Sequence, residues 1–247
     1  MTHPVLALFH DVADAVAERL AAATDRGPSG QRVGQYAIDL VSDATALAVL
    51  RDAGYGVLSE ESGVTARAGA AVVVIDPLDG STNFSRGVPW YATALCLVDE
   101  AGPAAALVAN QATGERYMAE RGGGAWRRDG TPLSPSRCAS PSSAIVGISG
   151  SPTGPYGWAQ FRALGASALD LCLVADGTLD GYVDMSPDAH GVWDYLAASL
   201  VCAEAGAPVV DALGRDLVVL DHGARRTPVA AATPELLDAL LRVRTAS

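Results

Sequence analysis

Basic residues, cysteines and long apolar runs are all scarce in this chain of 247 residues. Lys and Arg together number 17 against 28 Asp and Glu, so the formal net charge is −11. Because binding a polyanion requires a basic face, this charge argues against a nucleic-acid partner and against an anionic membrane surface. No apolar run approaches the ~20 residues that span a bilayer, and no signal peptide is apparent at the N-terminus. We therefore expect a cytoplasmic protein.

Cysteine and histidine chemistry is equally sparse. The four cysteines form no Cys-x-x-Cys pair and lie among apolar or small residues, namely Cys96, Cys138, Cys172 and Cys202. This pattern is typical of buried free thiols in a reducing compartment, so we expect no zinc site. The four histidines are scattered, and only His190 is expected near the acidic residues described below. No convincing Cys/His or Ser/His pair indicates a covalent nucleophile.

Hydrophobic patterning predicts a mixed fold. Apolar residues at helical spacing predict helices over 4–24 and 36–53, and two more near the C-terminus, "VWDYLAASLVCAEAG" and "PELLDALLRVR". Continuous apolar runs predict buried strands, first in "AAVVVIDP" and then within 91–119. This mixture predicts a layered α/β or α+β fold.

A Ser/Pro-rich patch at 134–143 is the best candidate for an internal boundary. It predicts an N-terminal α+β half, residues 1–140, that carries most of the acidic motifs. The C-terminal α/β half, residues 141–247, would carry the Trp-Asp motif and the substrate wall. With 49% hydrophobic residues the chain can bury a sizeable core, so we expect the halves to form one compact unit.

Two aspartates follow a buried strand in the stretch "VVVIDPLDGSTNF". Asp76 ends the apolar run, Pro77 cannot donate to a sheet ladder, and Asp79 follows three residues after Asp76. Neighbouring carboxylates repel each other in a poorly solvated site, and a hard cation such as Mg²⁺ relieves this repulsion. The alternative is structural, with both aspartates serving a turn or capping a helix that begins near Gly80.

The residues after Asp79 suggest what such a metal would do. "GSTN" can open a helix whose free backbone N–H groups bind phosphate, through Gly80, Ser81 and Thr82. A metal site beside a phosphate site is the arrangement that metal-assisted hydrolysis of a phosphate ester requires.

Three further acidic positions join this prediction. Glu60 and Glu61 follow a short strand in "GVLSEESG", and Asp194 lies near the start of a helix in "GVWDYLAAS". Each alone is equally well explained as an exposed turn residue or a first-turn helix residue. On the second predicted helix, Asp43 is favoured over Asp39, because a small polar stretch follows the apolar run there.

Together these motifs resemble the inositol monophosphatase family of Mg²⁺-dependent, lithium-sensitive phosphatases. Its acidic turn resembles "SEES", and its central signature is matched by residues 76–84. Its Trp-Asp signature is matched by "VWDYLAASLVCAEAGAPVVD", and the resemblance runs in order from about residue 5 to 245. The resemblance implies a layered αβαβα sandwich of the inositol monophosphatase and fructose-1,6-bisphosphatase type, and a homodimer.

The resemblance also implies roles for individual residues. One metal would be bound by Glu60, Asp76 and the Leu78 carbonyl, and a second by Asp76, Asp79 and Asp194. Two to three Mg²⁺ ions would bind in all, with Mn²⁺ as an alternative. Glu60 and Ser81 would orient the attacking water, and Asp43 would help to bind or position a third, weaker metal or its water. The backbone of Gly80, Ser81 and Thr82 would hold the phosphate.

The substrate wall is where the sequence departs from the family pattern. Asp184 stands where inositol-specific members have a glutamate, and the connection "MSPDAHGV" is a few residues longer. We expect Ser167 and Asp184, with Asp79 and Asp194, to contact the substrate.

The predicted function is a metal-dependent phosphomonoesterase that acts on a small polyol phosphate such as inositol 1-phosphate. Histidinol phosphate is the second candidate substrate. Fructose bisphosphate and 3′-phosphoadenosine 5′-phosphate are less favoured. A non-catalytic metal-binding homologue is the alternative from a different class.

Overall fold

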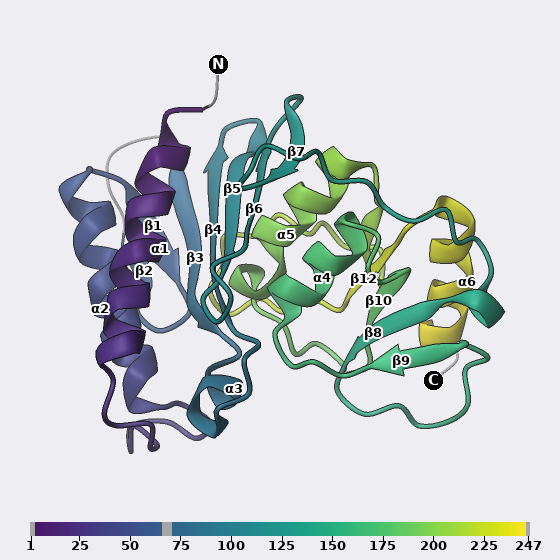
Figure 1. Cartoon of the computed structure of the whole chain (residues 1–247), viewed down its shortest axis with the longest axis horizontal. Helices are drawn as coiled ribbons and strands as arrows, with labels where there is room; N and C mark the ends of the chain where they lie inside the picture. The colour runs from purple at the N-terminus through teal and green to yellow at the C-terminus, as the bar shows by residue number, and fades with distance from the viewer. Residues whose placement is uncertain (1–2, 66–70, 246–247) are drawn as a thin grey trace.

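The computed structural model describes residues 3–65 and 71–245, and these stack in five alternating layers of helix and sheet (Figure 1). The outer layer on one side holds α1 (Val5–Ala22) and α2 (Ala37–Asp52), which pack on the first sheet. The middle layer holds α4 (Ser167–Ala175) and α5 (Val192–Ala205), and α6 (Pro234–Thr245) covers the far side of the second sheet. The predicted αβαβα sandwich is therefore confirmed.

The first sheet has the strand order β2-β1-β3-β4-β5-β6-β7. Its strands are β1 (Gly56–Ser59), β2 (Gly63–Thr65), β3 (Val72–Asp79), β4 (Ala92–Asp99), β5 (Gly102–Asn110), β6 (Arg116–Glu120) and β7 (Gly124–Arg127). β1 and β3 are parallel, whereas the remaining neighbours are antiparallel. In the parallel pair Ser59 lies opposite Ile75, so Glu60, which follows β1, comes beside Asp76, which β3 still carries although the sequence placed it at the strand's end.

The second sheet has the order β11-β12-β10-β8-β9. Its strands are β8 (Ile145–Ser149), β9 (Gln160–Arg162), β10 (Gly181–Asp184), β11 (Val209–Asp211) and β12 (Pro228–Ala231). β10 runs parallel to β8, and Asp184 ends it opposite Ser149. This register places Asp184 at one end of the sheet, where the connection to α5 begins.

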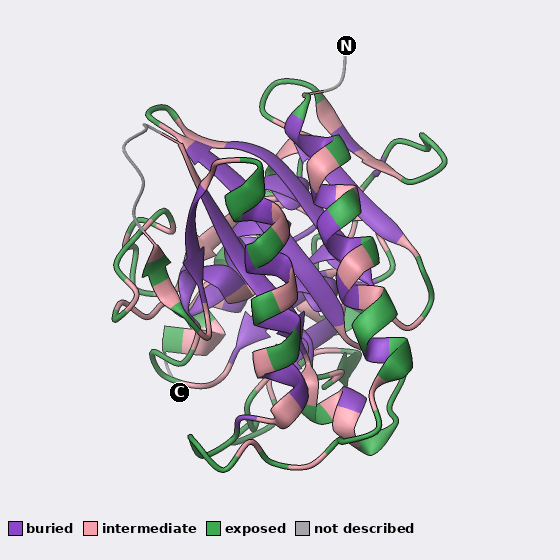
Figure 2. Ribbon diagram, turned by 90° about the vertical axis from the view of Figure 1, so that its left-hand side faces the viewer, coloured by how far each residue is buried: buried purple, intermediate pink, exposed green. Residues whose placement is uncertain are grey.

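The hydrophobic pattern of each helix matches the exposure of the layer in which the helix lies. α1 buries one stripe, which includes Phe9, Val12 and Val16, and exposes the other side. Figure 2 shows this division on the outer helices, with the buried strands behind them. By contrast, α5 is buried almost all round because sheets lie on both of its sides. It ends at Gly206, whose φ of 95° suits a left-handed cap.

The chain halves share their hydrophobic core. The first sheet uses only strands before residue 128, and the second only strands after residue 144. One buried cluster nevertheless contains Val74 of β3 together with Leu171 of α4 and Leu196 of α5. The division at residue 140 stays a prediction, because the two halves share this core. The homodimer also stays a prediction. Within the described residues no helix is long and apolar enough to cross a membrane.

Candidate active site

Three carboxylates converge where the first sheet meets the middle helices. Asp76 lies on β3, Glu60 follows β1, and Asp194 is in the first turn of α5. One oxygen from each lies within 4.8 Å of the others. The parallel pairing of β1 and β3 brings the first two together, and packing of α5 against β3 adds the third. Residues 134 positions apart in the chain, Glu60 and Asp194, thus form one acidic centre.

The electrostatics of this centre indicate a cation site. Burial, and then the charges of Glu60 and Asp79, raise the pKa of Asp76 well above its ordinary value. Burial and the Asp194 charge do the same to the pKa of Glu60. A buried carboxylate cluster without a cation is unfavourable because desolvation and like charges add. The donors are all oxygen atoms, which suits a hard divalent cation such as Mg²⁺.

A bulge at the end of β3 shapes the next residues. Asp76 pairs with Ala94 and Asp79 pairs with Ala92, so the intervening residues leave the regular ladder. The Leu78 N–H donates to Asp76 Oδ1 at 2.9 Å, which fixes that carboxylate. Pro77 and Leu78 therefore lie in the bulge, and the metal-ligand role expected for the Leu78 carbonyl stays a prediction.

Asp79 lies outside the three-carboxylate cluster and connects the two halves. Its Oδ2 accepts a 2.8 Å hydrogen bond from the backbone N–H of Ala168, in the first turn of α4. Burial and the Asp194 charge raise its pKa to about 7, although the bond from Ala168 acts in the opposite direction. The carboxylate therefore faces the acidic centre on one side and the start of α4 on the other.

Gly80 lets the chain turn sharply from β3 into α3 (Ser81–Arg86). Its φ is +84°, and a Cβ built on it would lie 3.0 Å from the Trp90 carbonyl and 3.1 Å from Ala166 Cβ. Glycine is therefore required by both conformation and space. The turn leaves first-turn N–H groups of α3, including those of Ser81 and Thr82, without partners inside the helix.

The acidic turn at Glu60 is held from several sides. Asp43 lies behind it and accepts hydrogen bonds from the hydroxyls of Ser59 and Ser62. Glu61 accepts from Arg32 at 2.5 Å and from Gln35, which covers its carboxylate. Asp43 and Glu61 thus support the turn, and neither belongs to the three-carboxylate cluster.

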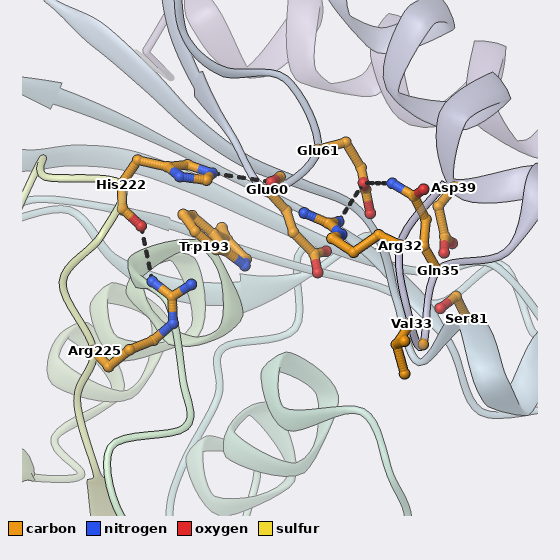
Figure 3. Close-up of a pocket in the computed structure, with 11 residues that line it drawn as sticks. Arg32, Val33, Gln35, Asp39, Glu60, Glu61, Ser81, Trp193, His222 and Arg225 are labelled. Carbon is orange, nitrogen blue, oxygen red and sulfur yellow. Dashed lines mark hydrogen bonds and ion pairs between the residues drawn. The ribbon is translucent and has the colours of Figure 1, made fainter. Parts of the chain in front are cut away.

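Asp39, rather than Asp43, lines the cavity beside the acidic centre. Figure 3 shows this cavity of about 320 Å³, in which Asp39 lies near Ser81 and across from Glu60. Burial raises the pKa of Asp39 to about 6. Its Oδ2 accepts from the Tyr36 N–H at 2.8 Å, whereas its Oδ1 is buried and has no hydrogen-bond partner among the described residues. Asp39 therefore lines this cavity, whereas Asp43 lies behind the turn of Glu60, and the catalytic role expected for Asp43 stays a prediction.

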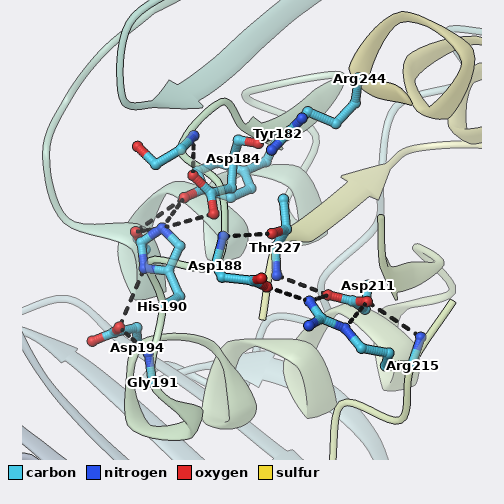
Figure 4. Close-up of polar contacts among 12 residues, drawn as sticks. Tyr182, Asp184, Asp188, His190, Gly191, Asp194, Asp211, Arg215, Thr227 and Arg244 are labelled. Atoms are coloured by element: carbon cyan, nitrogen blue, oxygen red, sulfur yellow. Dashed lines mark hydrogen bonds and ion pairs between the residues drawn. The ribbon is translucent and has the colours of Figure 1, made fainter. Parts of the chain in front are cut away.

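The predicted substrate wall, which includes Asp184, lies next to Asp194, and His190 contacts both aspartates (Figure 4). The Ser167 hydroxyl accepts a 3.0 Å bond from the Tyr182 hydroxyl, and His190 lies 3.4 Å from both hydroxyls. Asp184 is fully buried, and burial raises its pKa to about 6. Among the described residues its Oδ2 has no hydrogen-bond partner, and the nearest cation is His190 at 3.7 Å.

His190 connects this wall to the acidic centre. Its Nδ1 lies 3.2 Å from Asp194 Oδ2. Burial lowers the pKa of His190, but the hydrogen bond and charge of Asp194, with the charge of Asp184, raise it overall to about 9.

The long connection that carries His190 is anchored to the second sheet. Arg215 bridges Asp211 and Asp188, at 2.8 and 2.7 Å (Figure 4). The Asp188 N–H donates to the Thr227 hydroxyl at 3.2 Å. The extra residues of the connection are therefore fixed in place.

Several residues around the site had no predicted role. Arg32, Trp193, His222 and Arg225 line the cavity of Figure 3, and Tyr182 completes the wall. Trp193 could have been flagged, because it precedes Asp194 directly in the sequence. Tyr182 lies two residues before Asp184, whereas Arg32, His222 and Arg225 belong to no acidic motif.

The layered fold and its acidic centre define the protein as a metal-dependent phosphatase, a phosphoric monoester hydrolase. A sequence model of the inositol monophosphatase family matches residues 10–246, so the chain belongs to that family.

Similar proteins carry more than one activity in their names. An inositol-1-monophosphatase of Rhizobium meliloti is 37% identical over 176 residues, covering 65% of this chain and 64% of that protein, slightly under two thirds. The fructose-1,6-bisphosphatase/inositol-1-monophosphatase of Methanocaldococcus jannaschii is 31% identical over 222 residues, covering 87% of this chain and 85% of that one. A solved structure, a hypothetical protein of Pyrococcus horikoshii with similarities for inositol-1 monophosphatase, superposes with a TM-score of 0.85 at 26% identity, covering 97% and 96%.

Proposed function

We propose that this phosphatase hydrolyses a small polyol phosphate such as inositol 1-phosphate, with Mg²⁺ held by its acidic centre. The observation that carries the proposal is the convergence of Glu60, Asp76 and Asp194 within 4.8 Å, beside the turn at Gly80. Burial and like charges raise the pKa values of Glu60 and Asp76, so the cluster is costly for the fold unless a cation offsets it. The names of the relatives, which include inositol-1-monophosphatase, support the substrate class.

The metal ligands are those that the family resemblance implies, and three of them form the observed cluster. Glu60, Asp76 and the Leu78 carbonyl would hold one ion, and Asp76, Asp79 and Asp194 a second. Bound Mg²⁺ would lower the pKa of a coordinated water and offset charge on the phosphoryl oxygens. The backbone N–H groups of Gly80, Ser81 and Thr82 would orient the phosphate.

Glu60, Ser81 and Asp39 would position the attacking water. Ser81 and Asp39 lie near each other on one side of the cavity, with Glu60 across from both (Figure 3). A carboxylate whose pKa is about 6, like that of Asp39, is close to the working pH and can accept a proton. The Ser81 hydroxyl can donate or accept a hydrogen bond and so would hold the water toward phosphorus.

Ser167, Asp184 and Asp194 would contact the alcohol part of the substrate. Asp184 offers a buried oxygen without a partner among the described residues, and Ser167 offers a hydroxyl beside Tyr182. Acceptors and hydroxyls in a confined wall suit the hydroxyl groups of a polyol.

Phosphate release from a substrate panel tests the proposal. The panel is inositol 1-phosphate, histidinol phosphate, fructose 1,6-bisphosphate and 3′-phosphoadenosine 5′-phosphate, each with Mg²⁺ and with a chelator. We expect inositol 1-phosphate to be turned over best, and only with metal. Turnover of another substrate at a higher kcat/KM would reject the polyol assignment, and no turnover by a folded, Mg²⁺-binding protein would favour a non-catalytic homologue.

The variants Asp39→Asn and Asp43→Asn separate the two aspartates of α2. We expect Asp39→Asn to lower kcat about a hundredfold, because the variant cannot accept a proton, and to leave the melting temperature equal or higher. We expect Asp43→Asn to lower the melting temperature, because it weakens the bonds to Ser59 and Ser62, while kcat at saturating Mg²⁺ falls less than tenfold. The reverse order of kcat losses would restore Asp43 to the catalytic role.

A further inference from the structure

We propose that His222 is a positioning residue that holds Glu60 in its metal-binding orientation, from the loop between β11 and β12. The proposal rests on the metal site of the proposed function and adds a residue that no acidic motif identifies. Its basis is a hydrogen bond between residues 162 positions apart, from His222 Nε2 to the Glu60 carbonyl at 3.0 Å. A carbonyl only accepts, so Nε2 carries the proton in this contact.

Both backbone polar groups of Glu60 are therefore fixed. The Glu60 N–H donates to the Ile75 carbonyl of β3 at 3.3 Å, and its carbonyl accepts from His222. The side chain of Glu60 leaves this backbone toward Asp76 and Asp194. Because Glu60 lies in a turn and not in a strand, the His222 bond constrains its carbonyl directly, in addition to the bonds that Asp43 and Arg32 make to the neighbouring Ser62 and Glu61.

The His222 ring also contacts the second ligand-bearing segment. It stacks on Trp193, with ring centroids 4.7 Å apart and planes at 32°. Trp193 directly precedes Asp194, and the Arg225 guanidinium lies 5.2 Å from the Trp193 ring. Figure 3 shows Trp193 between His222 and Arg225, beside Glu60. One imidazole thus contacts the turn of Glu60 and the residue before Asp194.

The loop itself is firmly connected to the rest of the second half. Arg225 donates to the His222 carbonyl at 2.8 Å, and Arg226 pairs with His190 through backbone bonds of 2.9 and 3.3 Å. His190 in turn contacts Asp194. The loop therefore contacts both segments that carry Glu60 and Asp194, which come from opposite halves of the chain. Groups that orient metal ligands affect metal affinity strongly, although they do not touch the metal.

Two substitutions at one position separate the hydrogen bond from the stacking. His222→Phe keeps a ring against Trp193 and removes the donor, whereas His222→Gln restores an N–H near the position of Nε2. Leu220→Ala, at an exposed residue of the same loop, is the matched control. Mn²⁺ binding is measured by calorimetry on the full chain without substrate. The melting temperature in chelator reports folding, and phosphate release is measured against Mg²⁺ concentration.

We expect His222→Phe to raise the Mn²⁺ dissociation constant about tenfold, with the Mg²⁺ requirement raised in parallel and kcat largely restored at saturating Mg²⁺. His222→Gln should stay within about twofold of wild type, as should Leu220→Ala. Wild-type Mn²⁺ affinity in His222→Phe would overturn the proposal, and so would equal losses in the Phe and Gln variants. If the wild type released no phosphate from any substrate, the proposed function would fail, and the Mn²⁺ affinities would still decide the role of His222.

Discussion

Asp76→Asn is expected to lower phosphate release about a thousandfold and, in chelator, to raise the melting temperature above that of wild type. Asp76 is 2% exposed and lies in the three-carboxylate cluster. The proposed site uses it for both metals, so its loss removes the charge that offsets two cations. Without metal the ionised Asp76 carboxylate destabilises the fold, because burial and the charges of Glu60 and Asp79 oppose its ionisation.

Asp76→Asn is informative because phosphate release is expected to fall while the melting temperature in chelator rises. An ordinary destabilising mutation would lower both activity and melting temperature. Asp216→Asn, at an exposed acidic residue, is the control and should change neither. Circular dichroism and calorimetry with and without Mg²⁺, beside phosphate release, give the full comparison. Retained activity, or a metal-free Asp76→Asn protein that melts below wild type at pH 8, would contradict a repulsive metal centre at this position.

The main elements of the fold were predictable because their patterns are long. The helix predicted over 4–24 is observed as Val5–Ala22, and the buried run at Val72–Asp79 is β3. The strands β2, β9 and β11 were not predicted, and each has only three residues. Such short strands exist because a neighbouring strand pairs with them, as Gly63–Thr65 does with β1. Their sequences alone do not carry a period-two pattern.

The choice between Asp39 and Asp43 shows where spacing stops being informative. The two residues are four apart on α2, so they share one face of the helix, and both are buried. The position at which α2 begins decides which one reaches the cavity. Asp39 lies in the first turn, where the helix end approaches Ser81, whereas Asp43 is one turn further and meets Ser59 and Ser62. This offset depends on how α2 packs on the first sheet.

Motifs identified the acidic centre, and they did not identify what holds it. Glu60 follows β1 and Asp194 lies in the first turn of α5, as expected, whereas Asp76 lies at a bulge within β3, which continues to Asp79 beyond the strand end that was expected at Asp76. The supports come from chain segments without a motif, such as Arg32 at Glu61 and His222 at Glu60. They are hydrogen bonds made across loops, and loop paths depend on the completed fold.

The melting temperature of the metal-free protein is expected to fall as the pH rises from about 5 to 8. Burial raises the pKa of Asp79 from 3.8 to about 7, and those of Asp39 and Asp184 to about 6. Each folded-state pKa lies above its unfolded value. The stability that each group contributes is therefore complete below about pH 4 and is lost as the pH rises through about 6 to 7. For Asp79 alone the shift corresponds to roughly 4 kcal/mol, or on the order of 10 °C.

Other groups do not reverse this trend. The pKa of Asp211 is lowered to about 2 by Arg215 and the Thr227 N–H against the effect of burial, so its contribution is already complete above about pH 4. His190 acts in the same direction as the aspartates, since its raised pKa of about 9 means that its contribution declines above about pH 6.5. Calorimetry in chelator across this range measures the slope, and Asp79→Asn should make it shallower. A melting temperature that rises between pH 5 and 8 would contradict the assigned pKa shifts.

Saturating Mg²⁺ should remove most of this slope. A cation bound among Glu60, Asp76 and Asp194 competes with protons for the same oxygens, so its apparent affinity rises with pH. The stabilisation by Mg²⁺, which grows with the ratio of free ion to dissociation constant, therefore becomes largest where the metal-free fold is weakest. We expect the difference between the two melting curves to widen steadily from pH 5 to 8. A constant difference would mean that the metal binds at carboxylates whose pKa values are ordinary, and hence away from the buried centre.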